Sequence, residues 1–430
     1  MKYRIIIFAL VGSLVLMSVL AFVFGRRGGG GEAATLEFWG TEDPANWSQA
    51  ISAYQTANPG VKIKYTQKDS LKYEKELVDA LASGAGPDVA VINNTWLNKH
   101  LNKFSPAPND AVSPQIFKDS FVDVTYEELV RSNKVYALPF YVDTLALYYN
   151  KALYNNAGLV SPPKTWDDFN KSVESLSQKN SNGDIIRSGT ALGTAANVNY
   201  ASDILNLLML QTGATMLNPN AQQAAFDRIV VLDGRNYSPG LAALDFYTSF
   251  ANSSKPVYAW NSRMPNSLKA FTAGKTAMYL GYAKDLKEIK KAVANLGVAP
   301  MPQIKDSRRD AAYLDINYAA YQAGAVTLSS LHKETAWNFL VFAAGRASAA
   351  GYLQSTYLPP ARRDLVDFTA TDPILNIFAK QALTAANWSQ PDEVEVKKIF
   401  ERMITATALG QTTAAEAIKE AAAEVTNLLK

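Results

Sequence analysis

A single carboxylate, Asp143, lies between two apolar runs in the middle of the chain. The first run, 135–138 (VYAL), stops at Pro139, which cannot donate a hydrogen bond to a sheet. The second run, 145–149 (LALYY), has the length and composition of a buried strand. Because an unpaired charge is costly to bury, a carboxylate at this position must find hydrogen-bond partners or a ligand. Tyr141 places a phenol beside it.

Two carboxylates that face each other across a cleft can hydrolyse a glycosidic bond, and Asp143 with Glu42 or Asp43 would supply such a pair. No nucleophile elbow, zinc motif, P-loop or Rossmann glycine pattern accompanies them in the sequence. The chain has no cysteine, which removes thiolate nucleophiles and cysteine-based zinc sites. The two histidines, His100 and His332, lie in polar helical surroundings, so we expect them at the surface. We therefore expect a protein without catalytic residues, metal or cofactor, with a glycoside hydrolase as the minor alternative.

The segment 35–92 contains the elements that would position such residues. Apolar strand patterns at its start, middle and end alternate with two helical patterns, which predicts a β-α-β-α-β unit and a parallel sheet covered by helices. In such sheets ligands bind at the carboxyl ends of the strands. The loops expected at that edge carry Trp39, Glu42 and Asp43 after the first strand, and Asn93, Asn94 and Trp96 after the third.

Length and charge limit the class of protein. A chain of 430 residues is too long for one ordinary core, so two domains are expected. Four of the 42 basic residues flank the first apolar segment, which leaves 38 against 39 acidic ones in the remainder. A nearly neutral body gives no electrostatic reason to expect nucleic acid as a partner.

The N-terminus departs from this soluble pattern. Residues 5–24 carry no charge and would span roughly 30 Å as a helix, about the thickness of a bilayer core. Gly25-Arg26-Arg27 follows instead of a small-x-small cleavage site, and no cysteine is available for lipid attachment. These features favour an uncleaved membrane anchor over a cleavable signal peptide, followed by a flexible glycine tether at 28–31.

Later segments add further signals. Thr165, followed three residues later by Asp168, predicts a capped helix start, and Thr413 with Glu416 predicts a capping box. The Pro-broken run 298–302 (VAPMP) predicts a second crossing between domains, and 319–326 is expected to be extended.

Four motifs, in this order and at these separations, resemble the family 1 extracellular solute-binding proteins of ABC importers, the group that includes maltose-binding protein. Each motif is weak by itself, whereas the combination is fairly specific for the family and covers nearly all of the chain after about residue 35. The motifs are 135–151 (VYALP…YYNK), 163–169 (PKTWDDF), 271–278 (FTAGKTAM) and 359–362 (PPAR).

This resemblance implies a periplasmic-binding-protein-like α/β fold of type II, with two lobes, a hinge and a central cleft. The expected boundaries are 1–34 for the anchor and linker, 35–142 plus 301–346 for the N-terminal lobe, and 143–300 plus 347–430 for the C-terminal lobe. Crossings are expected near Pro139–Thr144 and Val298–Pro302, with a further exchange after Ala344. The implied function is reversible binding of a sugar or oligosaccharide outside the cell membrane, with lobe closure recognised by permease subunits, by a protein that we expect to be a monomer.

The resemblance also extends the set of ligand-binding positions. Asp143 stands where maltose-binding protein has a ligand-contacting carboxylate, and Tyr282 stands where the family often places an aromatic platform. Aromatic faces and polar edges suit a sugar, which offers flat apolar faces and hydroxyls. Peptide, polyol, phosphosugar and glycerol-phosphate ligands stay open, as does a sensor that works without a permease. The full set is Asp143, Trp39, Tyr282, Glu42, Asp43, Asn93, Asn94, Trp96 and Tyr141, with Trp260, Tyr318, Trp388 and Arg362 added from position alone.

Overall fold

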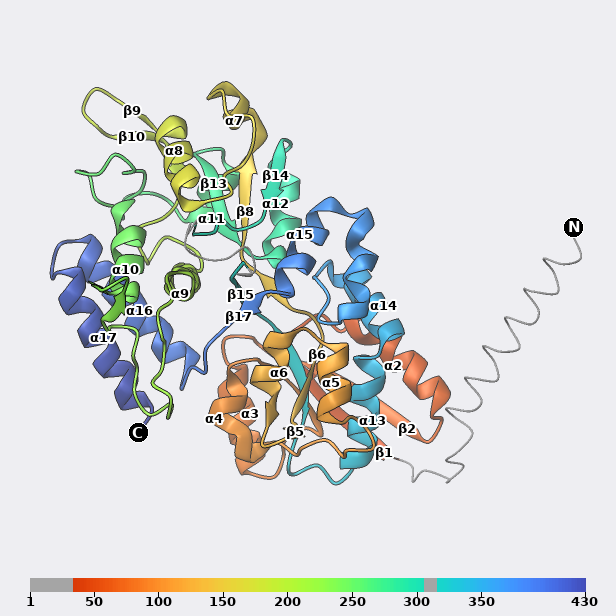
Figure 1. Cartoon of the computed structure of the whole chain (residues 1–430). Helices are drawn as coiled ribbons and strands as arrows, with labels where there is room; N and C mark the ends of the chain where they lie inside the picture. Colours follow the sequence, from red (N-terminus) through yellow and green to blue (C-terminus); the bar gives the residue numbers. More distant parts are fainter. Residues whose placement is uncertain (1–33, 305–314) are drawn as a thin grey trace, which may run out of the picture.

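Two sheets covered by helices divide the protein into two lobes (Figure 1). The computed structural model describes residues 34–304 and 315–430. The sheet of the N-terminal lobe has, in order, β2 (Val61–Gln67), β1 (Ala34–Gly40), β3 (Val89–Asn93), β16 (Gln322–Val326) and β6 (Ala137–Pro139). The sheet of the C-terminal lobe has β14 (Leu296–Ala299), β8 (Ala146–Asn150), β13 (Thr276–Gly281), β10 (Ile185–Thr190) and β9 (Gln178–Lys179). A short crossing sheet between them has β17 (Ala385–Ala386), β15 (Asn317–Ala320) and β7 (Asp143–Thr144).

The predicted β-α-β-α-β unit is confirmed in the N-terminal lobe. β1 pairs in parallel with both β2 and β3, so the carboxyl ends of all three strands meet at one edge. Residues 89–92 of β3 are apolar and buried because the strand lies between β1 and β16, with helices over the sheet. The helices of this lobe are α2 (Ala45–Ala57), α3 (Tyr73–Ala82), α4 (Trp96–His100), α5 (Pro114–Ser120), α6 (Asp123–Leu129), α13 (Lys333–Ala343) and α14 (Arg346–Thr356), with the hairpin β4 (Val130–Arg131) and β5 (Lys134–Val135).

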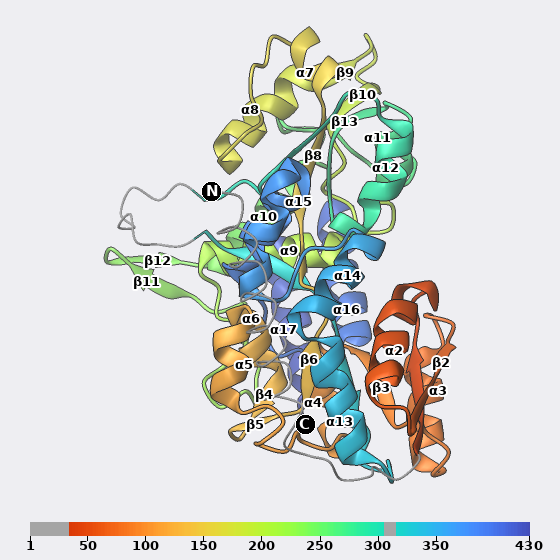
Figure 2. The same cartoon turned by 90° about the vertical axis from the view of Figure 1, so that its right-hand side faces the viewer.

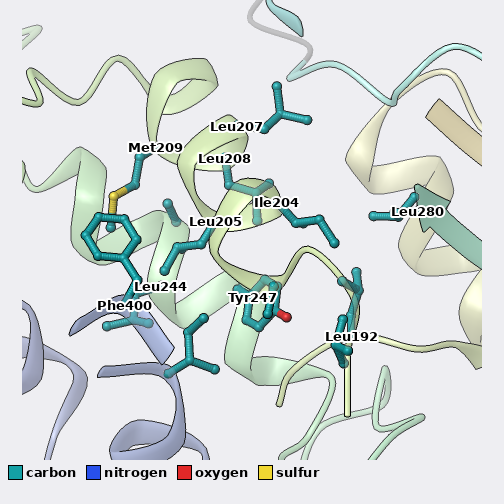
Figure 3. Packing of buried hydrophobic residues seen from close by; sticks show 14 of the residues in the cluster. Leu192, Ile204, Leu205, Leu207, Leu208, Met209, Leu244, Tyr247, Leu280 and Phe400 are labelled. Carbon is teal, nitrogen blue, oxygen red and sulfur yellow. The ribbon is translucent and has the colours of Figure 1, made fainter. Parts of the chain in front are cut away.

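The C-terminal lobe packs around α9 (Ala201–Thr212), which is apolar on nearly all sides (Figure 3). Leu205 and Met209 lie on the side of α9 that faces Leu244 of α10 and Phe400 of α16, and Ile204 and Leu208 are buried on another side, as expected for a helix that is buried rather than amphipathic. The other helices are α7 (Lys151–Asn156), α8 (Trp166–Leu176), α10 (Pro239–Ser249), α11 (Ser267–Thr272), α12 (Leu286–Ala292), α15 (Pro373–Ala382), α16 (Glu393–Ala408) and α17 (Ala414–Leu428), with the hairpin β11 (Val230–Leu232) and β12 (Arg235–Tyr237) and the short 3-10 helix η2 (Ala283–Asp285).

Local cap signals are borne out by the structure. Thr165 accepts a hydrogen bond from the backbone N–H of Asp168, and this contact starts α8. Thr413 and Glu416 form the reciprocal capping box at the start of α17. Each cap satisfies backbone groups that a helix end otherwise leaves without partners.

The positions at which the chain crosses between the lobes after residue 298 differ from the predicted ones. The predicted second crossing, Val298–Pro302, begins in β14, which pairs with β8 inside the C-terminal lobe, and the chain crosses at β15 instead. Residues 347–356, expected in the C-terminal lobe, belong to α14, which packs on α2 of the N-terminal lobe (Figures 1 and 2). Tyr352 and Leu353 of α14 join the N-terminal core, so apolar contacts hold this helix there.

The predicted membrane anchor at 5–24 lies outside the described residues. Within the part of the chain that the structure describes, no helix has both the length and the apolar character needed to span a bilayer.

Candidate ligand site between the lobes

The loop after β1 presents three of the predicted residues. Trp39 is half-buried, and the Nζ of Lys68 lies 3.7 Å from the centre of its ring. Glu42 accepts a hydrogen bond from the Tyr352 hydroxyl at 2.6 Å, and burial raises the pKa of its carboxyl. Asp43 is exposed and accepts from the N–H of Ala45, at the start of α2. Lys68 therefore covers the face of the Trp39 ring against which we expected a sugar to pack.

The loop after β3 places its three predicted residues at different depths. Asn93 is half-buried and accepts from Nε2 of Gln322 at 3.3 Å. Asn94 is buried and donates from Nδ2 to the carboxylate of Glu128 at 3.1 Å. Trp96 is buried beside the ring of Tyr73. Of these three side chains, Asn93 keeps the most exposed surface.

Asp143 is 2% exposed, and its carboxylate is held by the backbone. Oδ1 accepts from the N–H groups of Thr144 and Ala283, both at 2.9 Å, and Oδ2 accepts from the N–H of Lys284 at 3.1 Å. Asp143 therefore joins the crossing sheet to the start of η2 in the C-terminal lobe. Burial raises the pKa of its carboxyl to about 7, although these hydrogen bonds oppose the shift. Tyr141 stacks on Tyr352 at 6.4 Å between ring centres.

The C-terminal lobe contributes a group of tyrosines and acids next to η2. The Tyr282 hydroxyl donates to Oδ2 of Asp203 at 2.9 Å, and the Tyr282 ring meets the Tyr200 ring edge-on at 4.8 Å. Tyr200 has a φ of 59°, a left-handed conformation that is uncommon for a tyrosine and marks the turn into α9. Burial raises the pKa of Asp203 to about 6, and the nearby Glu393 adds to the shift.

Sequence reasoning missed Asp203, Tyr200, Lys284 and Glu393. One signal was available, because Asp203 is the single charge in the apolar helix SDILNLLMLQ. Asp203 lies in the first turn of α9, a helix that is buried in the core of the C-terminal lobe.

The residues chosen from position alone are mostly buried. Trp260 has no exposed surface and donates to Oδ1 of Asn197 inside the C-terminal lobe, so the structure leaves no face of it for a ligand. Tyr318 and Trp388 are nearly buried and hydrogen-bond to Gln390 and Asn206. Arg362 forms an ion pair with Asp364 and lies over the ring of Phe121.

The two lobes touch where α4 meets the start of α16, a region that we name the α4–α16 contact (Thr95, Lys99, Asp392, Glu393). The Thr95 hydroxyl donates to Oε2 of Glu393 at 2.6 Å. The Nζ of Lys99 lies 2.6 Å from Oδ2 of Asp392, and these side chains are 36% and 21% exposed. This ion pair is therefore partly shielded from water, which makes it stronger than a fully exposed pair.

The α4–α16 contact is supported from within the N-terminal lobe. Lys99 also pairs with Glu74 at 3.0 Å, and Nε2 of His100 lies 2.9 Å from the same Glu74 oxygen. The surface position expected for His100 is wrong, because the ring is buried between α4 and α3. Glu74 thus fixes the position of Lys99.

Glu128, on α6, links the crossing sheet to the N-terminal lobe. Its carboxylate is 6% exposed and accepts from the side-chain amides of Asn94 and of Asn387, the latter at 3.2 and 3.3 Å. Burial raises the pKa of Glu128 to about 7, despite these hydrogen bonds. Its charged form is therefore disfavoured in the folded protein.

Glu128→Gln should reduce the pH dependence of stability. A carboxyl with a raised folded-state pKa contributes stability below its ordinary pKa, and this contribution is lost as the pH rises toward 7. Urea unfolding at pH 5 and pH 8 should show a decline in the free energy of unfolding that is smaller in the variant, by on the order of 2 kcal/mol. Glu420→Gln, at an exposed position on α17, is the matched control. Equal declines in all three proteins would contradict the assignment.

The comparisons with known proteins agree with this architecture. A model of the bacterial extracellular solute-binding proteins matches residues 39–350. A Brucella abortus protein, whose name states only that it is a binding protein, is 24% identical and aligns over 97% of this chain and 98% of its own. A galactooligosaccharide-binding protein of Bacillus subtilis is 21% identical over 84% of this chain and 80% of its own. The sugar-binding protein MalE of Xanthomonas citri superposes with a TM-score of 0.76 and 20% identity, over 92% of this chain and 97% of that one.

The fold is that of the type II periplasmic binding proteins, as the superposition shows. The chain belongs to the family of bacterial extracellular solute-binding proteins, because the family model covers most of its length. It is therefore a binding protein and not an enzyme, which agrees with the names of its relatives.

Proposed function

We propose that the protein binds a sugar or oligosaccharide between its two lobes and presents it to the permease of an ABC importer. The observation that carries the proposal is the α4–α16 contact, in which Thr95, two residues beyond β3, meets Glu393 of the other lobe. The charge of Glu393 in turn acts on Asp203. A solute held there would touch both lobes, so binding would favour the closed arrangement. The names of the galactooligosaccharide-binding and sugar-binding relatives support a carbohydrate.

The chemistry of the side chains also supports a carbohydrate. Half-buried Tyr200, whose ring packs edge-on against buried Tyr282, offers aromatic surface, and Asp203 and Glu393 offer acceptors for hydroxyl groups. Asn93 adds an amide from the opposite lobe. Of the ligand residues predicted from the sequence, we propose that half-buried Trp39, Glu42, Asn93 and Tyr141 face the solute, and that Asp143 and Tyr282 shape the site from beneath.

Delivery to a permease requires the lobes to lie outside the cytoplasm. The family name describes its members as extracellular, which agrees with this requirement. We further propose that residues 5–24 hold the lobes at the membrane and that the protein acts as a monomer. Fractionation of cells that express the full chain, with and without residues 5–24, checks the anchor.

A thermal-shift screen against neutral oligosaccharides, polyols and peptides tests the proposed ligand class. A ligand present at 100 times its Kd stabilises the folded state by about 2.7 kcal/mol, which raises Tm by several degrees. We expect such a shift with at least one oligosaccharide. A shift with peptides alone would overturn the proposal.

A further inference from the structure

Two acids, Glu393 of the α4–α16 contact and the nearby Asp203, indicate which charge a solute can carry. This inference rests on the proposed function. Asp203 and Glu393 each take one hydroxyl hydrogen, from Tyr282 at 2.9 Å and from Thr95 at 2.6 Å. A carboxylate can accept several hydrogen bonds, so both groups suit a partner rich in O–H or N–H donors. An anionic solute brings acceptors and like charge instead.

Two helix starts near this contact, those of η2 and α16, are already occupied by the protein's own acids. Asp143 accepts from the N–H groups of Ala283 and Lys284 at the start of η2. Asp392 accepts from the N–H groups of Val394 and Glu395 at the start of α16. Backbone N–H groups at helix starts are common phosphate ligands in proteins. Here a phosphate would have to displace a carboxylate to reach them.

The lysines around the contact are also engaged. Lys99 pairs with Glu74 and Asp392, and Lys68 lies over Trp39 and 3.6 Å from Glu76. Lys284 lies over the rings of Tyr200 and Tyr282, at 4.9 and 5.1 Å from their centres.

The charge of Lys284 acts on three carboxylates, those of Asp143, Asp203 and Asp285. Lys397 of α16 also acts on Asp203. Together with Glu393, the acids next to η2 and α9 still outnumber these two lysines, which favours a negative local potential.

We propose that Asp203 and Glu393 act as a charge filter, so that the site accepts uncharged polyhydroxyl or cationic sugars and rejects phosphorylated ones. Two of the ligand classes left open by the sequence, phosphosugars and glycerol phosphates, are thereby excluded. The two residues determine specificity through charge, while their oxygens still accept hydrogen bonds from the solute.

Calorimetric titration of the full chain with maltose, maltose 6′-phosphate and sn-glycerol 3-phosphate tests the filter. Maltose 6′-phosphate should bind at least about tenfold more weakly than maltose, since each like-charge contact at a few ångströms is unfavourable. Glu393→Gln and Asp203→Asn keep an acceptor oxygen for Thr95 and Tyr282 but remove the charge. Each substitution should reduce the difference in affinity between maltose and maltose 6′-phosphate severalfold. Glu420→Gln removes the same charge from the exposed face of α17 and should leave this difference unchanged.

The proposed charge filter would be overturned if the native protein bound maltose 6′-phosphate as tightly as maltose, or more tightly. It would also be overturned if neither substitution reduced the difference in affinity between the two sugars. If maltose does not bind, the binding of sn-glycerol 3-phosphate tests the charge filter instead. Its binding only to the Glu393→Gln or Asp203→Asn variant supports the filter, and its binding to the native protein, or to none of the proteins, contradicts it. The proposed function is judged separately, because it fails only if no carbohydrate in the thermal-shift screen binds.

Discussion

Replacing Asp143 by alanine should lower the free energy of unfolding by about 3 kcal/mol, because two buried backbone N–H groups and a third, partly buried one would lose their acceptor. Each unsatisfied group costs about 1–3 kcal/mol, and relief of the buried charge offsets part of the sum. Asp143→Asn keeps one acceptor oxygen and should lose less. Urea unfolding at pH 7 measures these differences. The sequence resemblance implied contact between Asp143 and a ligand, whereas the backbone contacts give its carboxylate a structural role.

Asp43→Ala is the matched control for this experiment. Asp43 also accepts from a backbone N–H at a helix start, but it is exposed, so its removal should cost about 1 kcal/mol or less. If Asp143→Ala were as stable as the native protein and lost only affinity, the structural role of Asp143 would be refuted. Its carboxylate would then act on the solute alone.

Lys99→Glu should weaken solute binding about tenfold, although we do not expect the side chain at position 99 to contact the solute. The substitution sets a carboxylate against Asp392 and Glu74 and so disfavours the arrangement in which α4 meets α16. A loss of about 1.4 kcal/mol from the closed form corresponds to that factor. Calorimetry with the best oligosaccharide from the screen gives the affinity, and small-angle X-ray scattering of the ligand-free protein should show a larger radius of gyration.

Lys75→Glu provides the control for Lys99→Glu. Lys75 also pairs with an acid, Asp79, but its side chain is 84% exposed and the pair lies within α3. An exposed pair of this kind contributes little, so affinity and radius of gyration should stay at native values. Identical scattering and affinity for Lys99→Glu and the native protein would show that the α4–α16 contact does not govern closure.

Local signals in the sequence predicted much of the fold. The buried strand β3, the cap at Thr165 and the capping box at Thr413 each depend on residues close together in the chain. The second crossing was misplaced because the run 298–302 is extended in either lobe, and only its pairing with β8 decides which. The position of α14 similarly depends on its packing against α2, which lies far away in the sequence.

The candidate site was harder to predict for the same reason. Asp143 was correctly expected to need partners, but the sequence could not show that distant backbone groups at Ala283 and Lys284 supply them. Asp203 was missed, although it is the single charge in the otherwise apolar segment 202–211. The ion pair between Lys99 and Asp392 joins residues from opposite ends of the chain, so no local pattern reveals it.

One carbohydrate should bind between the lobes and close them. Calorimetric titration of the full chain with the oligosaccharide that gives the largest thermal shift, with scattering recorded before and after saturation, tests it most directly. We expect saturable binding of one molecule per chain together with a smaller radius of gyration. Saturable binding with an unchanged radius of gyration in both the native protein and Lys99→Glu, or no binding by any oligosaccharide, would contradict it.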